Sequence, residues 1–149
     1  MILLENKKVR LRYSVLETYS AGMELLGGEV KSLRAHHGSL DGARIIVRAG
    51  EAYLIGATIP PYQIKNTPEN YDPERTRRIL LSKKEIAELA DAESKKGLTI
   101  VPLEVYNNRY VKLRIAIVKG KSKVDKREDL KKADAARDID RALKTKGRV

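Results

Sequence analysis

Residues 98–118 read LTIVPLEVYNNRYVKLRIAIV, and this stretch decides the fold. In its second half, apolar residues alternate with Lys112 and Arg114, which is the period of a strand with one buried face. The residues predicted to face the core are Val111, Leu113, Ile115 and Ile117. Because Asn107-Asn108-Arg109 separates two strand-like segments, the stretch predicts an antiparallel hairpin with strands at 98–106 and 110–118.

Segments upstream of this hairpin also have the pattern of strands. Apolar residues alternate with arginine and serine over 9–15, which predicts a half-buried strand. The small residues at 20–22 predict a turn, followed by a returning strand at 23–26. Residues 43–48 and 51–57 predict a second hairpin.

Helical signals are fewer. Residues 29–37 predict a short helix, and Ser82 with Glu85 forms a capping box that opens another helix, ending at Gly97. The residues of that helix predicted to face inward are Ile86, Leu89 and Ala90. Residues 60–74 hold four of the five prolines and predict a long loop. Several short antiparallel strands with two to three helices predict a mainly β fold, a small closed antiparallel barrel of the oligonucleotide-binding kind.

The composition points to a polyanionic partner. The 149 residues include 31 lysines and arginines against 20 acidic residues, a net charge of +11. This favours nucleic acid, although many soluble proteins are basic without binding it. The lack of cysteine excludes disulfides, thiolate zinc sites and thiol nucleophiles. We expect a cytoplasmic protein, because there is neither a signal peptide pattern nor a long apolar run.

The charge also divides the chain. Residues 119–149 hold twelve basic and six acidic side chains with few large aliphatic residues, so they cannot form a core of their own. Asp125 and Glu128 have the spacing of a capping box. We expect residues 1–118 to be an RNA-binding β-barrel domain. We expect residues 119–149 to be a basic tail, disordered when free and helical against a partner; a permanently solvated tail is the alternative.

Two groups of arginines are candidates for phosphate contact. Arg10 and Arg12 follow Asn6-Lys7-Lys8 and would lie on one outward face of a strand, where their guanidinium groups suit phosphate contact. The alternative is an edge strand whose charges discourage aggregation. The run 75–78 places three arginines beside the long loop, which favours RNA contact over a solvated turn.

One motif raises the question of catalysis. Glu29 and Lys31 have the E-x-K spacing of some metal-dependent nucleases, but a helical setting spoils that geometry. We therefore expect no enzyme activity, no catalytic residue and no metal or other cofactor.

These motifs coincide, in order and spacing, with those of a known family. The segments are NKK at 6–8, ETYSAG at 17–22, GGEVKSLR at 27–34, GEAYL at 50–54, DPERTRRILL at 72–81 and KGKSKVDKR at 119–127. They span roughly residues 6–144 and resemble the SsrA-binding protein family. Several blocks in register are far more specific than any one of them.

The resemblance implies a function in translation. It implies an oligonucleotide-binding barrel that binds the tRNA-like domain of transfer-messenger RNA. The protein would deliver this RNA, with elongation factor Tu and GTP, to stalled ribosomes for trans-translation, which tags the incomplete protein. It would act as a monomer, without catalysis or membrane contact. The alternative is another basic translation-associated or RNA-chaperone barrel that binds structured RNA.

The resemblance also implies roles for individual residues. Residues that would face transfer-messenger RNA are Asn6, Lys7, Arg10, Glu29, Lys31, Arg75, Arg77 and Leu80. Residues of the tail that would face the decoding centre and mRNA channel of the ribosome are Lys119, Lys121, Lys123, Asp125, Lys126, Arg127, Lys131 and Lys132. The chain departs from the family's usual residues at three positions: Leu11 in place of His, Ser20 in place of an acid, and Val124 in place of an aromatic residue or His.

Overall fold

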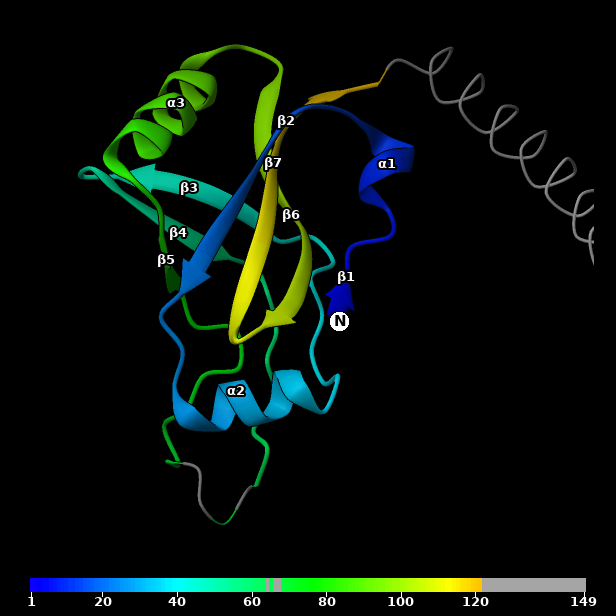
Figure 1. The fold of residues 1–149 in the computed structure, drawn as a ribbon, viewed down its shortest axis with the longest axis vertical. Helices are drawn as coiled ribbons and strands as arrows, with labels where there is room; N and C mark the ends of the chain where they lie inside the picture. The colour runs from blue at the N-terminus through cyan, green and yellow to red at the C-terminus, as the bar shows by residue number, and fades with distance from the viewer. Residues whose placement is uncertain (64, 66–67, 122–149) are drawn as a thin grey trace, which may run out of the picture.

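The hairpin predicted from residues 98–118 is the longest pair of strands in the computed structural model, which describes residues 1–63, 65 and 68–121 (Figure 1). Its two strands pair from Leu98 opposite Lys119 to Asn108 opposite Tyr110, with a shift of register between Pro102 and Glu104. Arg109 forms the turn with a positive φ of 50°. The predicted hairpin is therefore confirmed, and it extends further at both ends than the sequence indicated.

In the part of the chain that the structure describes, seven antiparallel strands form one sheet in the order β1-β6-β7-β2-β5-β4-β3. The strands are β1 (Ile2–Glu5), β2 (Tyr13–Met23), β3 (Arg44–Arg48), β4 (Glu51–Ile55), β5 (Arg77–Leu80), β6 (Leu98–Asn108) and β7 (Tyr110–Gly120). The mainly β prediction and the second hairpin, β3–β4, are confirmed. The edge strand β1 was not predicted.

The sheet curls without closing. Figure 1 shows β3 and β4 behind β6 and β7, and β3 packs beside β6. Within the described part of the chain, however, no backbone ladder joins β3 to β6 or to β1. One reason is that β1 already occupies the outer edge of β6 at Glu104–Tyr106. The predicted closed barrel is not confirmed, and the observed sheet is open with β1 and β3 at its edges.

The described residues form three helices, α1 (Val9–Arg12), α2 (Gly27–Arg34) and α3 (Lys83–Ser94). In Figure 1, α3 lies at one end of the curled sheet and α2 at the other. The predicted capping box of α3 is confirmed, because Ser82 Oγ accepts a hydrogen bond from the Glu85 amide at 3.2 Å. Leu89 is buried as predicted. Ala90 is exposed, and Ala92 is the alanine that faces the core.

The strand prediction for residues 9–15 is wrong in its first half. Val9–Arg12 form the single turn α1, because Val9 folds back to pack against Val101 and Ala116 on the outer face of the sheet. The turn predicted at Ser20–Gly22 is also wrong. These residues continue β2, since each pairs with a residue of β7.

The position of the main core explains why apolar residues alternate along β7. Val111, Leu113, Ile115 and Ile117 are all buried in the main core, as predicted. Near the end of the strand, Val118 is buried on the opposite face under α1. The β6–β7 hairpin therefore contributes to two hydrophobic clusters and holds α1 in place.

The predicted division of the chain lies close to the end of the sheet. β7 continues to Gly120, two residues beyond the expected boundary at 118. The tail residues predicted to face the ribosome that lie outside the described residues are Lys123, Asp125, Lys126, Arg127, Lys131 and Lys132.

Candidate nucleic-acid interface

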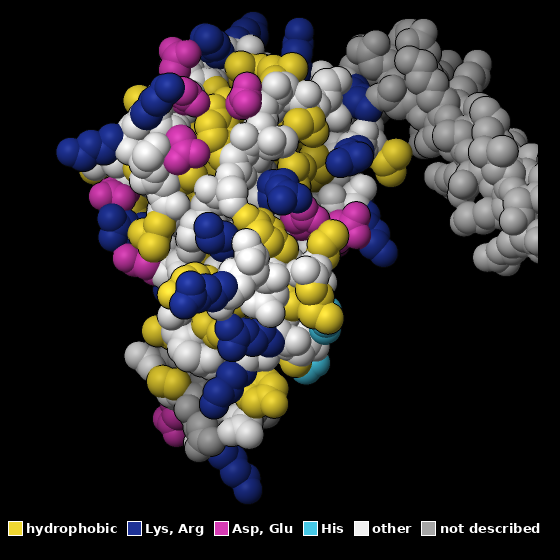
Figure 2. Space-filling model, in the orientation of Figure 1, with side chains coloured by type: hydrophobic (Ala, Val, Ile, Leu, Met, Phe, Trp, Pro, Cys, Tyr) yellow, Lys and Arg dark blue, Asp and Glu magenta, His cyan; other side chains and the backbone are white. Residues whose placement is uncertain are grey.

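On the outer face of the sheet, α1 covers Val101, Ala116 and Val118, and no other helix of the described residues covers the remainder. Opposed residues of paired strands share a face, so the register places Leu80, Gly22, Lys112 and Tyr106 side by side across β5, β2, β7 and β6. We call this surface the open face. Its side chains are Thr18, Ser20, Leu80, Glu104, Tyr106, Lys112 and Arg114. Figure 2 views the molecule from this side and shows lysines and arginines following one another toward α2, with apolar side chains between them.

A tyrosine–arginine stack spans three strands of the open face. The guanidinium carbon of Arg114 lies 5.0 Å from the centre of the Tyr106 ring, which is a cation–π arrangement. Arg114 also forms an ion pair with Glu104, and the Tyr106 hydroxyl is hydrogen-bonded to Ser20 Oγ. Because each group is held by a neighbour on another strand, the stack is a fixed, planar surface of the kind on which RNA bases stack.

An apolar groove continues the open face toward α1. It has a volume of about 460 Å³ and lies between α1 and β2, with Leu11, Tyr13, Val15 and Leu103 in its lining. Leu11 is 48% exposed, which is high for a large aliphatic side chain. Lys121 closes one end, since its amide donates to Arg12 O at 3.0 Å and its Nζ to Arg10 O at 2.7 Å.

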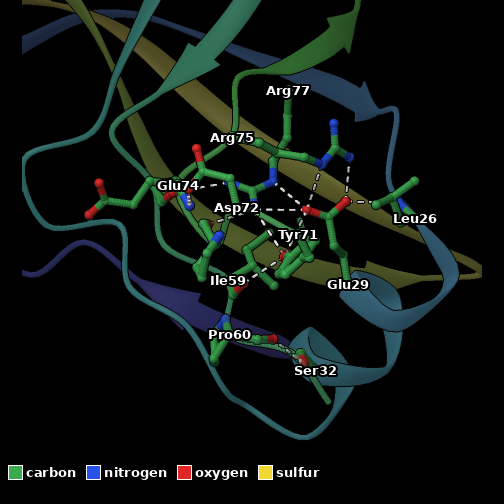
Figure 3. A network of polar contacts seen from close by, with 12 residues as sticks. Leu26, Glu29, Ser32, Ile59, Pro60, Tyr71, Asp72, Glu74, Arg75 and Arg77 are labelled. Carbon is green, nitrogen blue, oxygen red and sulfur yellow. Dashed lines mark hydrogen bonds and ion pairs between the residues drawn. The ribbon is translucent and has the colours of Figure 1, made fainter. Parts of the chain in front are cut away.

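A buried ion cluster lies at the other end of the molecule (Figure 3). Glu29 of α2 accepts hydrogen bonds from two arginines: Arg77 Nε at 2.8 Å and Arg75 Nε at 3.0 Å, both to Oε2. Its other oxygen, Oε1, accepts the Leu26 amide at 2.8 Å. Glu29 is 1% exposed and Arg77 is fully buried, whereas Arg75 keeps 29% of its side chain exposed.

The same cluster closes the base of the long loop. Arg77 donates to Ala57 O at 3.0 Å and to Pro73 O at 2.8 Å, so it bridges the two ends of the loop. The Tyr71 hydroxyl lies 2.7 Å from Ile59 O and 3.1 Å from Glu29 Oε2. Figure 3 shows these groups converging on the Glu29 carboxylate, which therefore joins the loop, β5 and α2.

The environment of Glu29 keeps it ionised. Burial alone would raise the pKa of this carboxyl group. The hydrogen bonds from Arg75, from the Leu26 amide and from Arg77 outweigh burial and hold the pKa below its usual value. The cluster thus contains one carboxylate and two guanidinium groups, and the excess positive charge is presented on the side where Arg75 is exposed.

Comparison with known proteins identifies the family. The family model described as SmpB protein matches residues 3–145. The chain belongs to the SmpB family. The SsrA-binding protein of Microcystis aeruginosa is 46% identical over 144 residues, covering 96% of this chain and 94% of the relative. The SsrA-binding protein of Salinispora tropica is 47% identical over 148 residues, covering 99% and 92%.

A solved structure supports the same family assignment. It is described as "tmRNA-SmpB: a journey to the center of the bacterial ribosome", and it matches with a TM-score of 0.68 and 41% identity. The match covers 87% of this chain and 95% of that chain. The resemblance to the SsrA-binding protein family noted in the sequence is therefore confirmed.

The RNA-facing residues implied by the SmpB resemblance fall into two groups in the structure. The exposed or partly exposed group is Lys7, Arg10, Lys31, Arg75 and Leu80. Glu29 and Arg77 are buried and present no surface to a ligand. Asn6 is half-buried, and its amide donates to Pro102 O at 3.0 Å, which fixes the connection between β1 and α1. The side chains of Asn6, Glu29 and Arg77 therefore stabilise the fold around the candidate interface.

The structure also brings together residues that the sequence did not single out. Tyr106 and Arg114 were seen as members of strands, and only the register shows that they stack. Ser20 was noted as a departure from the SmpB family, and its hydroxyl anchors that stack. Leu11 and Leu80, which the resemblance did single out, are both exposed; Leu80 lies on the open face and Leu11 in the adjoining groove.

Other classes of site find no support in the described residues. Among residues 1–63, 65 and 68–121, no group of three or more His, Cys, Asp or Glu side chains is arranged to hold a metal ion. In the same part of the chain, no helix has the length and apolar character needed to cross a membrane.

Proposed function

We propose that this member of the SmpB family binds the tRNA-like domain of transfer-messenger RNA through its open face and delivers that RNA to stalled ribosomes for trans-translation. The tyrosine–arginine stack carries the proposal, because it offers a planar stacking surface at one fixed place on the open face. Family membership and the names of the relatives support the identity of the RNA.

The proposal assigns direct RNA contacts to exposed side chains only. Lys7 precedes α1 and Arg10 is part of it, Leu80 lies on the open face, and Lys31 is part of α2, against which Arg75 is held by Glu29. Asn6, Glu29 and Arg77 act through the groups they hold, and Glu29 fixes the guanidinium of Arg75 for contact with phosphate. This arrangement spreads weak contacts over the length of the molecule, which suits an RNA domain rather than a short oligonucleotide.

For the tail, residues 119–149, we propose contact with the decoding centre and mRNA channel of the ribosome, in a helical form. The charge of its twelve basic side chains supports this assignment. The anchoring of Lys121 on α1 also supports it, because it sets the point from which the tail leaves the sheet.

We further propose how the complex is assembled. The chain acts in the cytoplasm as a monomer and catalyses no reaction. Elongation factor Tu with GTP joins the complex through the RNA. The curled sheet resembles an oligonucleotide-binding barrel that is open on one side, and this supports a role in gripping and placing RNA.

A reconstituted tagging reaction tests the proposed function. The purified chain, alanyl-charged transfer-messenger RNA, elongation factor Tu and GTP are added to ribosomes stalled on an mRNA without a stop codon. We expect tag addition that depends on the chain, and we expect an elongator tRNA to compete poorly for binding. Tag addition that is the same without the chain, or equal affinity for the elongator tRNA, would overturn the proposal.

A further inference from the structure

A second cavity lies beside α1, bounded by the Asp41-Gly42 turn and by β6. Its volume is about 220 Å³, and we call it the α1 cavity. Three cationic side chains line it: Lys8, Arg12 and Arg44. The hydroxyl-bearing residues Tyr13 and Thr99 also line it. The cavity adjoins the apolar groove at Tyr13, which lines both, but the groove has Arg10 and Leu11 of α1 in its lining where the cavity has Arg12.

The three cations of the α1 cavity have no partner within the described residues. No hydrogen bond or ion pair involves the side chains of Lys8, Arg12 or Arg44 in that part of the chain. Among the described residues, Asp41 is the one acidic residue of the lining, and it forms an ion pair with none of the three cations. By contrast, Arg75 and Arg114 each form an ion pair with a glutamate. The α1 cavity therefore carries uncompensated positive charge.

The walls of the cavity are held in place. The side-chain amide of Asn6, the residue after β1, donates to Pro102 O at 3.0 Å and to Leu40 O at 3.4 Å. It therefore joins the segment before α1 to β6 and to the turn before β3. The Lys121 amide holds the backbone of Arg12. The cations come from two segments with fixed backbones, α1 with its N-cap residue Lys8 and the start of β3, which lowers the entropy lost when a ligand binds.

The size and chemistry of the cavity select the ligand. Pockets that enclose a whole small molecule usually measure about 300–1,000 Å³. The α1 cavity is smaller, so it suits one chemical group of a larger ligand. Guanidinium groups match the oxygens of a phosphate in a bidentate manner, and hydroxyl groups add further donors.

We propose that the α1 cavity binds a backbone phosphate of RNA, at a site separate from the open face. This goes beyond the proposed function, because it assigns an RNA contact on the other side of α1. The site is next to the point where the basic tail leaves the sheet, so RNA bound here lies close to both the sheet and Lys121.

A charge-matched pair of full-length variants tests the site. The first is Lys8→Gln, Arg12→Gln and Arg44→Gln combined. The control is Lys83→Gln, Lys84→Gln and Lys96→Gln combined, which removes the same charge from exposed lysines in and beyond α3. The affinity of each protein is measured for transfer-messenger RNA and, separately, for ribosomes, over a range of salt concentrations.

We expect the cavity variant to bind transfer-messenger RNA, ribosomes or both about tenfold more weakly than the control variant does. We also expect its plot of log affinity against log salt to be less steep by about 1, since a lost phosphate contact releases one fewer counterion. A loss of affinity for either partner supports the phosphate site and shows whether transfer-messenger RNA or ribosomal RNA occupies it. Indistinguishable slopes and affinities for the two variants with both RNAs overturn it. If melting shows that the triple variant is unfolded, Arg44→Gln alone is judged by the same slope.

Discussion

Arg77 and Glu29 form an ion pair that is closed to water, with 2.7 Å between Arg77 Nη2 and Glu29 Oε2. Two charged groups in the interior are costly unless their remaining donors and acceptors are satisfied. Here they are, because the same guanidinium also donates to Ala57 O and Pro73 O, and the carboxylate also accepts the Leu26 amide. The pair therefore joins three segments that are distant in sequence.

The variant Arg77→Ala tests the importance of this pair for stability. It removes the fully buried partner of Glu29 and leaves Ala57 O and Pro73 O without their donor, and breaking a buried ion pair in this way costs about 3–5 kcal/mol of unfolding free energy. Urea unfolding followed by circular dichroism measures the loss. Arg75→Ala is the control, because its side chain is partly exposed and its removal leaves the Arg77 pair intact. Equal losses in the two variants would contradict the assignment.

The pH dependence of stability should show the ionised Glu29. The pKa of Glu29 is held below its ordinary value of 4.5, so the unfolded chain binds this proton more readily than the folded chain. The stabilisation is present in full above about pH 4.5 and is lost as the pH falls through the folded pKa. Urea unfolding at a series of pH values measures it.

Glu29→Gln provides the comparison for this prediction. At pH 7 the variant should be less stable than the parent chain, and the gap should narrow as the pH falls below about 4.5. A gap that stays constant down to pH 3 would mean that the carboxylate charge is not what stabilises the cluster.

The stack on the open face predicts a defined loss of RNA affinity. Tyr106→Leu removes the ring while keeping an apolar side chain, and a base stacked on an aromatic ring contributes about 1–3 kcal/mol. We expect transfer-messenger RNA to bind about tenfold more weakly, as measured by fluorescence anisotropy. Arg114→Ala should weaken binding in the same direction.

The matched control for Arg114→Ala is Arg48→Ala. Arg48 is likewise an exposed arginine paired with a glutamate, Glu93, but it lies at the β3–α3 contact, away from the open face. This variant should bind RNA like the parent chain. If both arginine variants lose affinity equally, only net charge is being measured.

Truncation separates the sheet from the tail. The chain should be cut after Lys121, because the amide and Nζ of this residue hold α1. We expect residues 1–121 to keep the melting temperature of the full chain and most of its affinity for transfer-messenger RNA, while tag addition on stalled ribosomes is lost. Normal tagging by residues 1–121 would show that the tail has no role. A cut after Val118 should lower the melting temperature as well.

The fold was predictable where a local pattern coincides with burial on one face. Alternation in β7 and the capping box of α3 are such patterns, and both predictions are confirmed. The prediction failed for residues 9–12, where one buried residue, Val9, decides the conformation through a contact with β6 and β7. It failed again at Ser20–Gly22, because the pairing with β7 outweighs the local turn preference.

The candidate site was predictable in residue type but not in role. The arginines at 75 and 77 look equivalent in sequence, and the structure buries one and partly exposes the other. That difference comes from the position of Glu29, which is more than forty residues away in the chain. The stack of Arg114 on Tyr106 likewise depends on strand register, which no short motif encodes.

The order of the strands has a consequence for the synthesis of this protein. The first strand, β1, pairs with β6, and the central strand β2 pairs along its length with β7. The segments that are translated first therefore obtain their partners from those translated last, and such distant pairings fold slowly. A nascent chain that stops before residue 110 would leave the long strand β2 without its β7 partner. The sheet should thus assemble only after nearly the whole chain has left the ribosome.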